Sequence, residues 1–264
     1  MSIYKVTPEK AREMIRGQEA VLLDVRQPEE YLEGHIPGAR LCPLPELEQR
    51  ASEQFKDKTQ PFIIYCRSGR RSILAAQKLE QLGYEVLYDL GGILDWPYTV
   101  VTLTDEVILE MSAFDHGDAK RIQHFMKVYE FSRMIAACEC IDRKTCDILM
   151  VASVMHDIGI RPSLEKYGDA IGPHQEELGP DYARPMLEKF EGLSEAFIDR
   201  VCYLIGHHHT YTNVDGDDYQ ILIEADFLVN SMEGEMDRET IRSMMERIFR
   251  TKTGIRLLKT EHDL

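Results

Sequence analysis

The chain has 264 residues, of which 44% are hydrophobic and 29% charged, a composition that can build two modest globular domains. Its formal net charge of −15 argues against nucleic acid or an anionic membrane surface as the main partner. No apolar run approaches the roughly 20 residues that a membrane-spanning helix needs, so no membrane segment is expected.

The charge is distributed unevenly along the chain. Residues 1–100 carry a net charge of −2, whereas residues 101–264 carry −13. A shift of this size predicts a domain boundary near residue 100. The connecting stretch, residues 97–105, has none of the glycine- or serine-rich sequence typical of a free tether. We therefore expect one domain over residues 1–100 and a second over residues 105–264.

Short apolar runs alternate with a helical pattern in the first hundred residues. Residues 21–25 and 61–65 are brief, apolar and rich in β-branched side chains, which predicts buried parallel strands. Residues 72–82 have apolar positions at helical spacing and stop at Gly83. Residues 85–88 follow as a third strand. Strand, helix and strand in this order predict an α/β fold with a parallel sheet and flanking helices.

Cys66 opens a loop between the second strand and the helix. Such a loop presents backbone N–H groups, and the helix dipole adds positive potential. Arg67, Arg70 and Arg71 add three cations around the thiol. These surroundings favour a nucleophilic thiolate. The alternative is a buried structural cysteine with exposed arginines.

Three segments together resemble a single-domain rhodanese: DVRQPEEYLEGHIPGA at residues 24–39, the Cys66 loop, and GGILDW at residues 91–96. The resemblance implies that Cys66 is the catalytic residue, taking sulfur from a sulfane-sulfur donor as a persulfide and passing it to a thiol acceptor. It also implies that the loop binds the substrate, through Arg67, Ser68, Gly69, Arg70 and Arg71.

Loop length separates this chemistry from a related one. Cysteine phosphatases that resemble rhodaneses carry an arginine six positions after the nucleophile, where this chain has Ser72. The arginine stands at position 71, so the loop is shorter and phosphatase activity at Cys66 is disfavoured. Cys42 is expected to pack in the core rather than to act as a resolving thiol.

From Asp105 onward the pattern is helical, with breakers at residues 159–162, 168–173 and 211–218. This pattern predicts an all-α domain of five or six helices. The stretch after Gly234 is expected to form one amphipathic helix, which either closes the bundle or forms a contact in a homodimer.

Histidines and carboxylates are embedded in these apolar helices. His156 and Asp157 follow the apolar run 148–155, and Asp226 lies inside the apolar stretch 221–229. Polar side chains in such positions are costly to bury unless something binds them, and imidazoles mixed with carboxylates suit a divalent metal ion. The candidate ligands are His124, His156, Asp157, His174, His207, His208 and Asp226.

The order of these ligands over residues 115–232, with the motif HDIG at residues 156–159, resembles the HD superfamily of metal-dependent phosphohydrolases. The resemblance implies two divalent ions, iron or manganese, with zinc, cobalt or nickel as further candidates. His124, His156, Asp157 and Asp226 would hold the first ion, and Asp157 would bridge to a second that is completed by His174 and His207. Leu204 favours His207 by helical spacing and Ile205 favours His208, so both remain candidates. The other reading of His124 is a core histidine, and that of His174 a surface residue.

The implied function is a binuclear phosphohydrolase acting on a nucleotide or another small phosphate ester. The cyclic-dinucleotide phosphodiesterases of this superfamily have a lysine where this chain has Ile160, and Arg161 would take its place beside the substrate. Their Gly-Tyr-Pro motif is also absent, which disfavours cyclic di-GMP. Two alternatives are a di-iron oxygenase, which uses the same ligands, and a regulatory protein in which sulfur on Cys66 controls the metal domain.

Cysteine usage indicates the compartment. The six cysteines form no Cys-x-x-Cys pair, and no signal peptide precedes them. Reduced thiols in a cytoplasmic protein are therefore expected.

Overall fold

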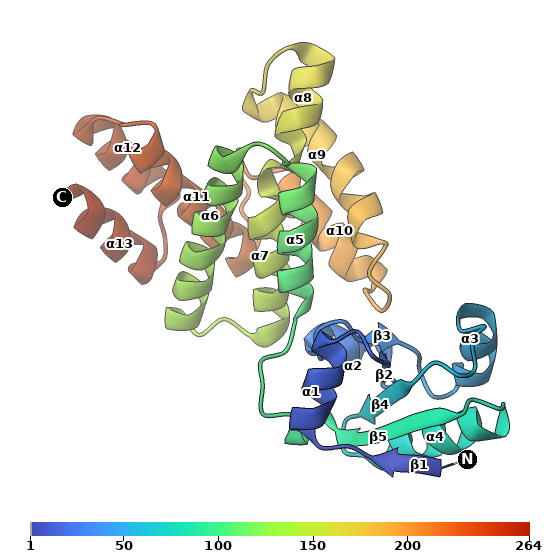
Figure 1. The fold of residues 1–264 in the computed structure, drawn as a ribbon. Coiled ribbons are helices and arrows are strands. Elements are labelled where there is room, and N and C mark those ends of the chain that lie inside the picture. The colour runs from blue at the N-terminus through green and yellow to red at the C-terminus, as the bar shows by residue number, and fades with distance from the viewer. Residues whose placement is uncertain (1) are drawn as a thin grey trace. The chain divides into compact units, whose positions relative to one another are not determined.

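The computed structural model describes residues 2–264 and divides them into two compact units, one ending at Leu103 and one running from Thr104 to Leu264 (Figure 1). No described helix combines the length and the apolar character needed to cross a lipid bilayer. All six cysteines are free thiols.

The first unit contains a five-stranded sheet in the order β1-β5-β4-β2-β3, and every neighbouring pair is parallel. The strands are β1 (Ser2–Lys5), β2 (Val21–Asp24), β3 (Arg40–Leu41), β4 (Phe62–Cys66) and β5 (Val86–Gly92). The three predicted strands are the three central ones, which confirms the parallel α/β fold. The edge strands β1 and β3 were not predicted, because they are short and lack a continuous apolar run.

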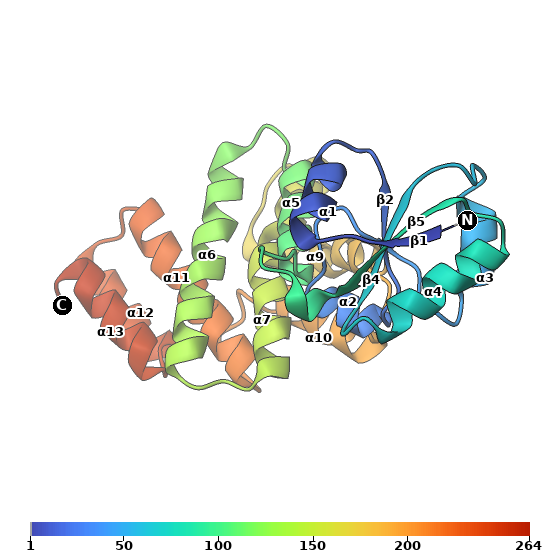
Figure 2. The ribbon, with the colours of Figure 1, turned by 60° about the horizontal axis from the view of Figure 1, so that its bottom comes forward.

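Helices cover both faces of this sheet (Figure 2). They are α1 (Pro8–Arg16), α2 (Pro28–Glu33), α3 (Leu47–Gln54) and α4 (Arg70–Gln81), followed by the 3₁₀ turn η1 (Ile93–Asp95). Because side chains alternate along a strand, Leu22 and Ile63 pack with α1, whereas Leu23 and Ile64 pack with α3 and α4. The predicted helix 72–82 is α4.

The second unit is helical. Between Leu103 and Leu264 the described chain forms α5 (Leu103–Phe114), α6 (Ala119–Cys138), α7 (Arg143–Met155), the 3₁₀ turn η2 (His156–Gly159), α8 (Ile160–Tyr167), α9 (Gly172–Leu187), α10 (Glu195–Ile205), α11 (Asp217–Glu233), α12 (Arg238–Ile248) and α13 (Lys252–His262). An all-α unit is therefore present, but the predicted number of five or six helices was too low.

The end of the chain shows why the helix count was too low. The stretch after Gly234 was predicted as one helix but forms two, α12 and α13. The break falls at Phe249, whose backbone is extended, and Thr251 then caps α13 by accepting a hydrogen bond from the Gly254 N–H. No glycine or proline marks this break, so helical periodicity alone did not reveal it.

The centre of the second unit is α11, which packs against α6 and α7. Residues 221–229 are all buried, as expected for a helix enclosed by others. After α7 the chain continues as the 3₁₀ turn η2, which packs on α9. Gly159 permits this close approach, because a Cβ there would lie 2.4 Å from the carbonyl oxygen of Gln175. The turn η2 is thus held at the end of α7, where it carries His156 and Asp157.

Candidate functional site

Cys66 lies at the carboxyl end of the central strand β4 and is only 1% exposed. Its Sγ accepts a hydrogen bond of 3.1 Å from the backbone N–H of Gly69. Gly69 has a φ of +90°, which glycine adopts without strain, and α4 begins at the next residue. The sulfur therefore lies beside a backbone donor and the amino-terminal end of a helix, where negative charge is stabilised.

The end of β5 supports this loop from the other side. A Cβ on Gly92 would lie 2.6 Å from the carbonyl oxygen of Arg67 and 2.8 Å from the Cα of Ser68, so only glycine fits there. The buried carboxylate of Asp89 accepts hydrogen bonds from Ser72 Oγ at 2.7 Å and from the Gly91 N–H at 3.1 Å. Asp89 therefore links the first turn of α4 to β5 by hydrogen bonds. Sequence reasoning noted the glycine pair but missed Asp89.

The three arginines expected around the thiol are not equivalent in the structure. Arg71 forms a two-pronged ion pair with Glu30 of α2, at 2.6 and 2.8 Å. This hydrogen bonding lowers the pKa of Glu30 from 4.5 to about 2 and, together with a smaller contribution from nearby Cys66, raises the pKa of Arg71. Arg67 and Arg70 are exposed and form no ion pair with any described residue. Two cations of the loop are therefore available to an anionic substrate, and the third is neutralised.

In the second unit, side chains from three elements bring imidazole nitrogens and carboxylate oxygens close together. His124 Nε2 of α6 lies 3.2 Å from Asp226 Oδ1 of α11 and 3.3 Å from His156 Nε2 of η2. His156 Nε2 is 3.4 Å from Asp226 Oδ1, and both imidazoles are 3.5 Å from Asp157 Oδ2. Donor atoms that share one cation at about 2.1 Å lie roughly 3 to 3.5 Å apart. His124, His156 and Asp157 therefore fit a single metal ion, and Asp226 lies beside the two imidazoles but outside this group of three donors, whose atoms all lie within 4.8 Å of one another.

The other nitrogen of each ring shows how the imidazoles are oriented. His156 Nδ1 lies 2.9 Å from the carbonyl oxygen of Ser153, and His124 Nδ1 lies 3.0 Å from Glu233 Oε2. A carbonyl can only accept, so Nδ1 of His156 carries a proton, and in the neutral ring its Nε2 presents a lone pair. Carboxylate and carbonyl partners of this kind orient histidines that bind metals.

The electrostatics of the cluster also favour a cation. Burial lowers the pKa of His124, but the hydrogen bond with Asp226 and the charge of Asp157 outweigh it and raise the pKa to about 9. Burial likewise opposes ionisation of Asp157 and Asp226, yet the neighbouring histidines hold the pKa of both carboxyl groups below its usual range. Two imidazole nitrogens and two carboxylates suit iron, manganese or zinc.

A second group adjoins the first through Asp157. His208 is fully buried, and its Nε2 lies 3.6 Å from Asp157 Oδ1, the oxygen not directed at His124. Asp157, His208 and His209 each offer a donor atom within 4.8 Å of the others. The Nε2 atoms of His208 and His209 are buried without a hydrogen-bond partner among the described residues. Buried polar atoms are rarely left unsatisfied, so a second cation fits here.

Two predicted ligands lie elsewhere. His207 Nδ1 bonds to the Tyr203 carbonyl oxygen at 2.7 Å and its ring stacks on Tyr203. His174 Nδ1 bonds to Asp169 Oδ1 at 2.7 Å and its ring stacks on Tyr167. Neither joins a described donor group. The chain leaves α10 at Ile205, so the three consecutive histidines point in different directions, and His208 with His209 faces Asp157 instead.

The predicted substrate residue Arg161 is also engaged elsewhere. Its guanidinium donates to the carbonyl oxygen of Phe114 at 2.9 Å and to Glu165 at 3.2 Å, and its side chain is half exposed. Arg161 therefore joins α8 to the end of α5, and no described contact links it to the donor cluster.

Sequence reasoning missed the residues that support the cluster. Asn230 donates to Asp226 Oδ1 at 2.8 Å, and Glu233 contacts His124. Asn230 and Glu233 follow Asp226 by four and seven positions, so helical spacing could have indicated them. Asp115 is 2% exposed, and burial raises its pKa, with a smaller contribution from the charge of Asp157.

Comparison with known proteins identifies the first unit. The Rhodanese-like domain family matches residues 7–97. Thiosulfate sulfurtransferase PspE of Escherichia coli (strain K12) is 37% identical over 73 residues, covering 28% of this chain and 70% of PspE. A sulfurtransferase of Allochromatium vinosum is 41% identical over 80 residues, covering 30% of this chain and 73% of that protein. The chain belongs to the rhodanese-like family through this N-terminal unit.

The share of the matched protein that this chain covers varies. The uncharacterized protein YqhL of Bacillus subtilis (strain 168) is 45% identical over 80 residues, and the chain covers 62% of its length. A solved structure, a rhodanese with anions from E. coli, is 34% identical with a TM-score of 0.30, covering 31% of this chain and 98% of that one. The family match ends at residue 97.

Proposed function

We propose that the first unit is a sulfurtransferase in which Cys66 carries the sulfur. The observation that carries the proposal is the buried Sγ at the end of β4 with the Gly69 N–H directed at it. The names of the relatives PspE and the A. vinosum sulfurtransferase support it. The exposed Arg67 and Arg70 would attract an anionic donor to the loop.

The transfer has two displacements. The Cys66 thiolate attacks the outer sulfur of a donor such as thiosulfate, a sulfur–sulfur bond forms on Cys66, and sulfite leaves with the electron pair of the broken bond. An acceptor thiolate then attacks the terminal sulfur, and the Cys66 thiolate is released. The Gly69 N–H and the start of α4 stabilise the negative sulfur in both states.

Mass spectrometry of the intact protein tests this role. After incubation with thiosulfate, the protein should gain the mass of one sulfur atom, and a thiol acceptor should remove it. Cys66→Ser should abolish the gain, whereas Cys138→Ser, at an exposed cysteine of the second unit, should leave it unchanged. Equal sulfur loading of Cys66→Ser would reject the proposal.

For the second unit we propose a divalent-metal-dependent phosphohydrolase acting on a nucleotide or another small phosphate ester. The observation that carries it is the approach of the Asp157 and Asp226 carboxylate oxygens to the paired His124 and His156 Nε2 atoms, at 3.2–3.5 Å. These residues would hold a first ion. Iron and manganese are the preferred candidates, and zinc, cobalt and nickel follow them. Asp157, His208 and His209 would hold a second.

Divalent ions in such a site lower the pKa of water and neutralise phosphoryl oxygens. The protein contributes the orientation: Ser153 and Glu233 hold the imidazoles, and Asn230 holds Asp226. This local positive charge would also let a chain of net charge −15 accept a phosphate ester.

Metal analysis and a phosphate-ester panel test this proposal. Anaerobically purified protein should contain a transition metal and release phosphate or nucleoside from at least one panel compound. Asp157→Ala should lose both the metal and the activity, whereas Asp181→Ala, at an exposed position on α9, should keep both. Oxygen consumption by metal-loaded protein without phosphate release would instead identify a di-iron oxygenase.

A further inference from the structure

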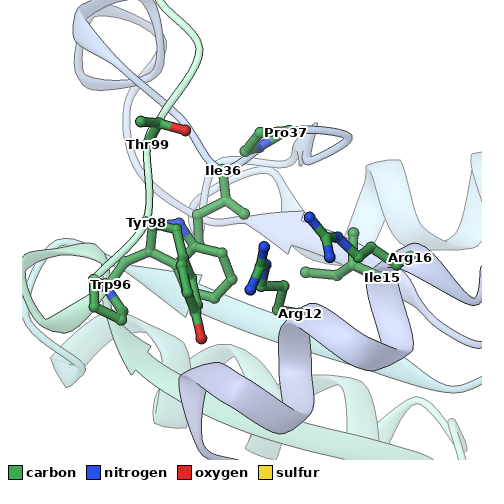
Figure 3. Close-up of a pocket in the computed structure, with 9 residues that line it drawn as sticks. Arg12, Ile15, Arg16, Ile36, Pro37, Trp96, Tyr98 and Thr99 are labelled. Atoms are coloured by element: carbon green, nitrogen blue, oxygen red, sulfur yellow. The ribbon is translucent and has the colours of Figure 1, made fainter.

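A cavity of about 520 Å³ opens on the α1 side of the sheet in the first unit (Figure 3). Its walls come from α1, from the loop before β3 and from the segment that follows η1. This volume is in the range of small-molecule sites. Cys66 does not line it, so the cavity is distinct from the sulfur-transfer site proposed above.

The cavity presents two cations without counter-ions. Arg12 and Arg16 are four residues apart on α1, so both point from the same face of the helix. Neither forms an ion pair with any residue that the structure describes, and none of the nine described lining residues is acidic. The guanidinium of Arg12 stacks over the ring of Tyr98 at 4.3 Å, which holds it toward the cavity. In Figure 3 the guanidinium of Arg12 lies between the Tyr98 ring and the guanidinium of Arg16.

Aromatic surface lies in the same wall. The indole Nε1 of Trp96 is buried and has no hydrogen-bond partner among the described residues. Trp96 packs edge-to-face on Tyr98 with ring centroids 5.0 Å apart, so its orientation is fixed. Ile15 and Ile36 supply apolar surface near Arg12 and Arg16.

We propose that this cavity binds an organic anion with an apolar body. The anionic head, a carboxylate or a phosphate monoester, accepts hydrogen bonds from Arg12 and Arg16. The apolar body lies along Ile15 and Ile36. A guanidinium pair recognises oxyanions of this kind by charge-assisted hydrogen bonds.

The single tryptophan of the chain provides the measurement. Because Trp96 is the only tryptophan, the tryptophan emission of the full-length protein reports this cavity alone. We would titrate the protein at constant ionic strength with hexyl phosphate, hexanoate and hexanol, none of which absorbs with tryptophan. At least one of the two anions should give a saturable change in emission and hexanol should give none. The anion that binds with the higher affinity identifies the preferred head group.

Matched variants then distinguish binding at this cavity from a general effect of the protein's positive charges. The double variant Arg12→Gln, Arg16→Gln should bind the anion about tenfold more weakly than the wild type, because charge-assisted hydrogen bonds are lost. Lys5→Gln removes one positive charge from an exposed position of the same unit and should bind as the wild type does. Undiminished sulfur loading on Cys66 would show that the double variant is folded. An equal response to hexanol, no saturable response to either anion, or unchanged binding by the double variant would overturn the proposal.

Discussion

One charged or titratable side chain beside each site is held by a specific carboxylate partner. Glu30 neutralises Arg71 beside the Cys66 loop, and Glu233 holds His124 beside the metal-donor cluster. Both carboxylates act through another residue, and neither touches the reacting position. Substitution at either should therefore change the behaviour of its partner while the fold is retained.

Removing the charge of Glu30 should make the first unit less sensitive to acid. The pKa of Glu30 is lowered from 4.5 to about 2, so its stabilising effect is complete above pH 4.5 and is lost as the pH falls toward 2. Glu30→Gln should cost about 1 kcal/mol at neutral pH, because the pair is partly exposed. Urea unfolding followed by Trp96 emission at several pH values measures this. Glu19→Gln, at an exposed position, is the control, and equal acid dependence of Glu30→Gln and the wild type would contradict the prediction.

Replacing Glu233 should weaken metal binding without removing a donor atom of the cluster. Glu233 accepts from His124 Nδ1 at 3.0 Å and from Lys127 at 2.7 Å, which fixes the ring and makes it more basic. Glu233→Gln should lower metal affinity about tenfold, as loss of such a supporting carboxylate does elsewhere. Competition with a chelator gives the affinity. The exposed Glu239→Gln serves as control, and equal affinities for the two variants would rule out the orienting role.

Glycines allow elements to approach closely at both sites. Gly92 brings the end of β5 against the Cys66 loop, and Gly159 brings η2 against α9. In each case the atom that a methyl group would meet is backbone, which cannot move aside as a flexible side chain can. The arrangement of the sites therefore depends on the absence of two side chains.

Gly92→Ala should displace the Cys66 loop. The new Cβ would lie 2.6 Å from the carbonyl oxygen of Arg67, so the loop must shift, at a cost of about 1 to 3 kcal/mol. Sulfur loading from thiosulfate should fall strongly. Gly17→Ala, where the nearest atom is a side-chain oxygen of Glu19 at 3.1 Å, should load normally. Normal loading of Gly92→Ala would show that the loop tolerates the shift.

The molecule consists of two units with separate cores, and each carries its own candidate site. Cys66 and Trp96 belong to the first unit, whereas every donor of the metal cluster belongs to the second. A change at one site can therefore be followed independently of the other.

Metal removal should destabilise only the second unit. A ligand that binds the folded state raises its stability, and the cluster of buried carboxylates and imidazoles lies entirely beyond Thr104. A chelator should lower the melting temperature followed by helical circular dichroism and leave the transition followed by Trp96 emission unchanged. Identical melting with and without metal in both signals would contradict a metal site.

Regulation between the units remains a separate prediction. If sulfur on Cys66 controls the second unit, thiosulfate loading should change the rate of phosphate release, and Cys66→Ser should remove that change. A rate that is the same for loaded and unloaded protein would exclude this form of control.

Local sequence was sufficient for the parts of the molecule that depend on neighbours along the chain. The three central strands, the helix after Cys66 and the positions of His156, Asp157 and Asp226 followed from apolar runs and short motifs, because buried segments of a sheet or bundle must be continuously apolar. The edge strands, the break at Phe249 and the pairing of Glu30 with Arg71 did not, since they rest on contacts between residues distant in sequence.

The same distinction applies to the candidate ligands. Adjacent histidines have nearly the same local sequence, so the sequence offered both His207 and His208. Packing at the end of α10 turns His207 toward Tyr203 and leaves His208 buried beside Asp157. The direction of a side chain after a helix ends depends on the surfaces around it, which only the folded chain supplies.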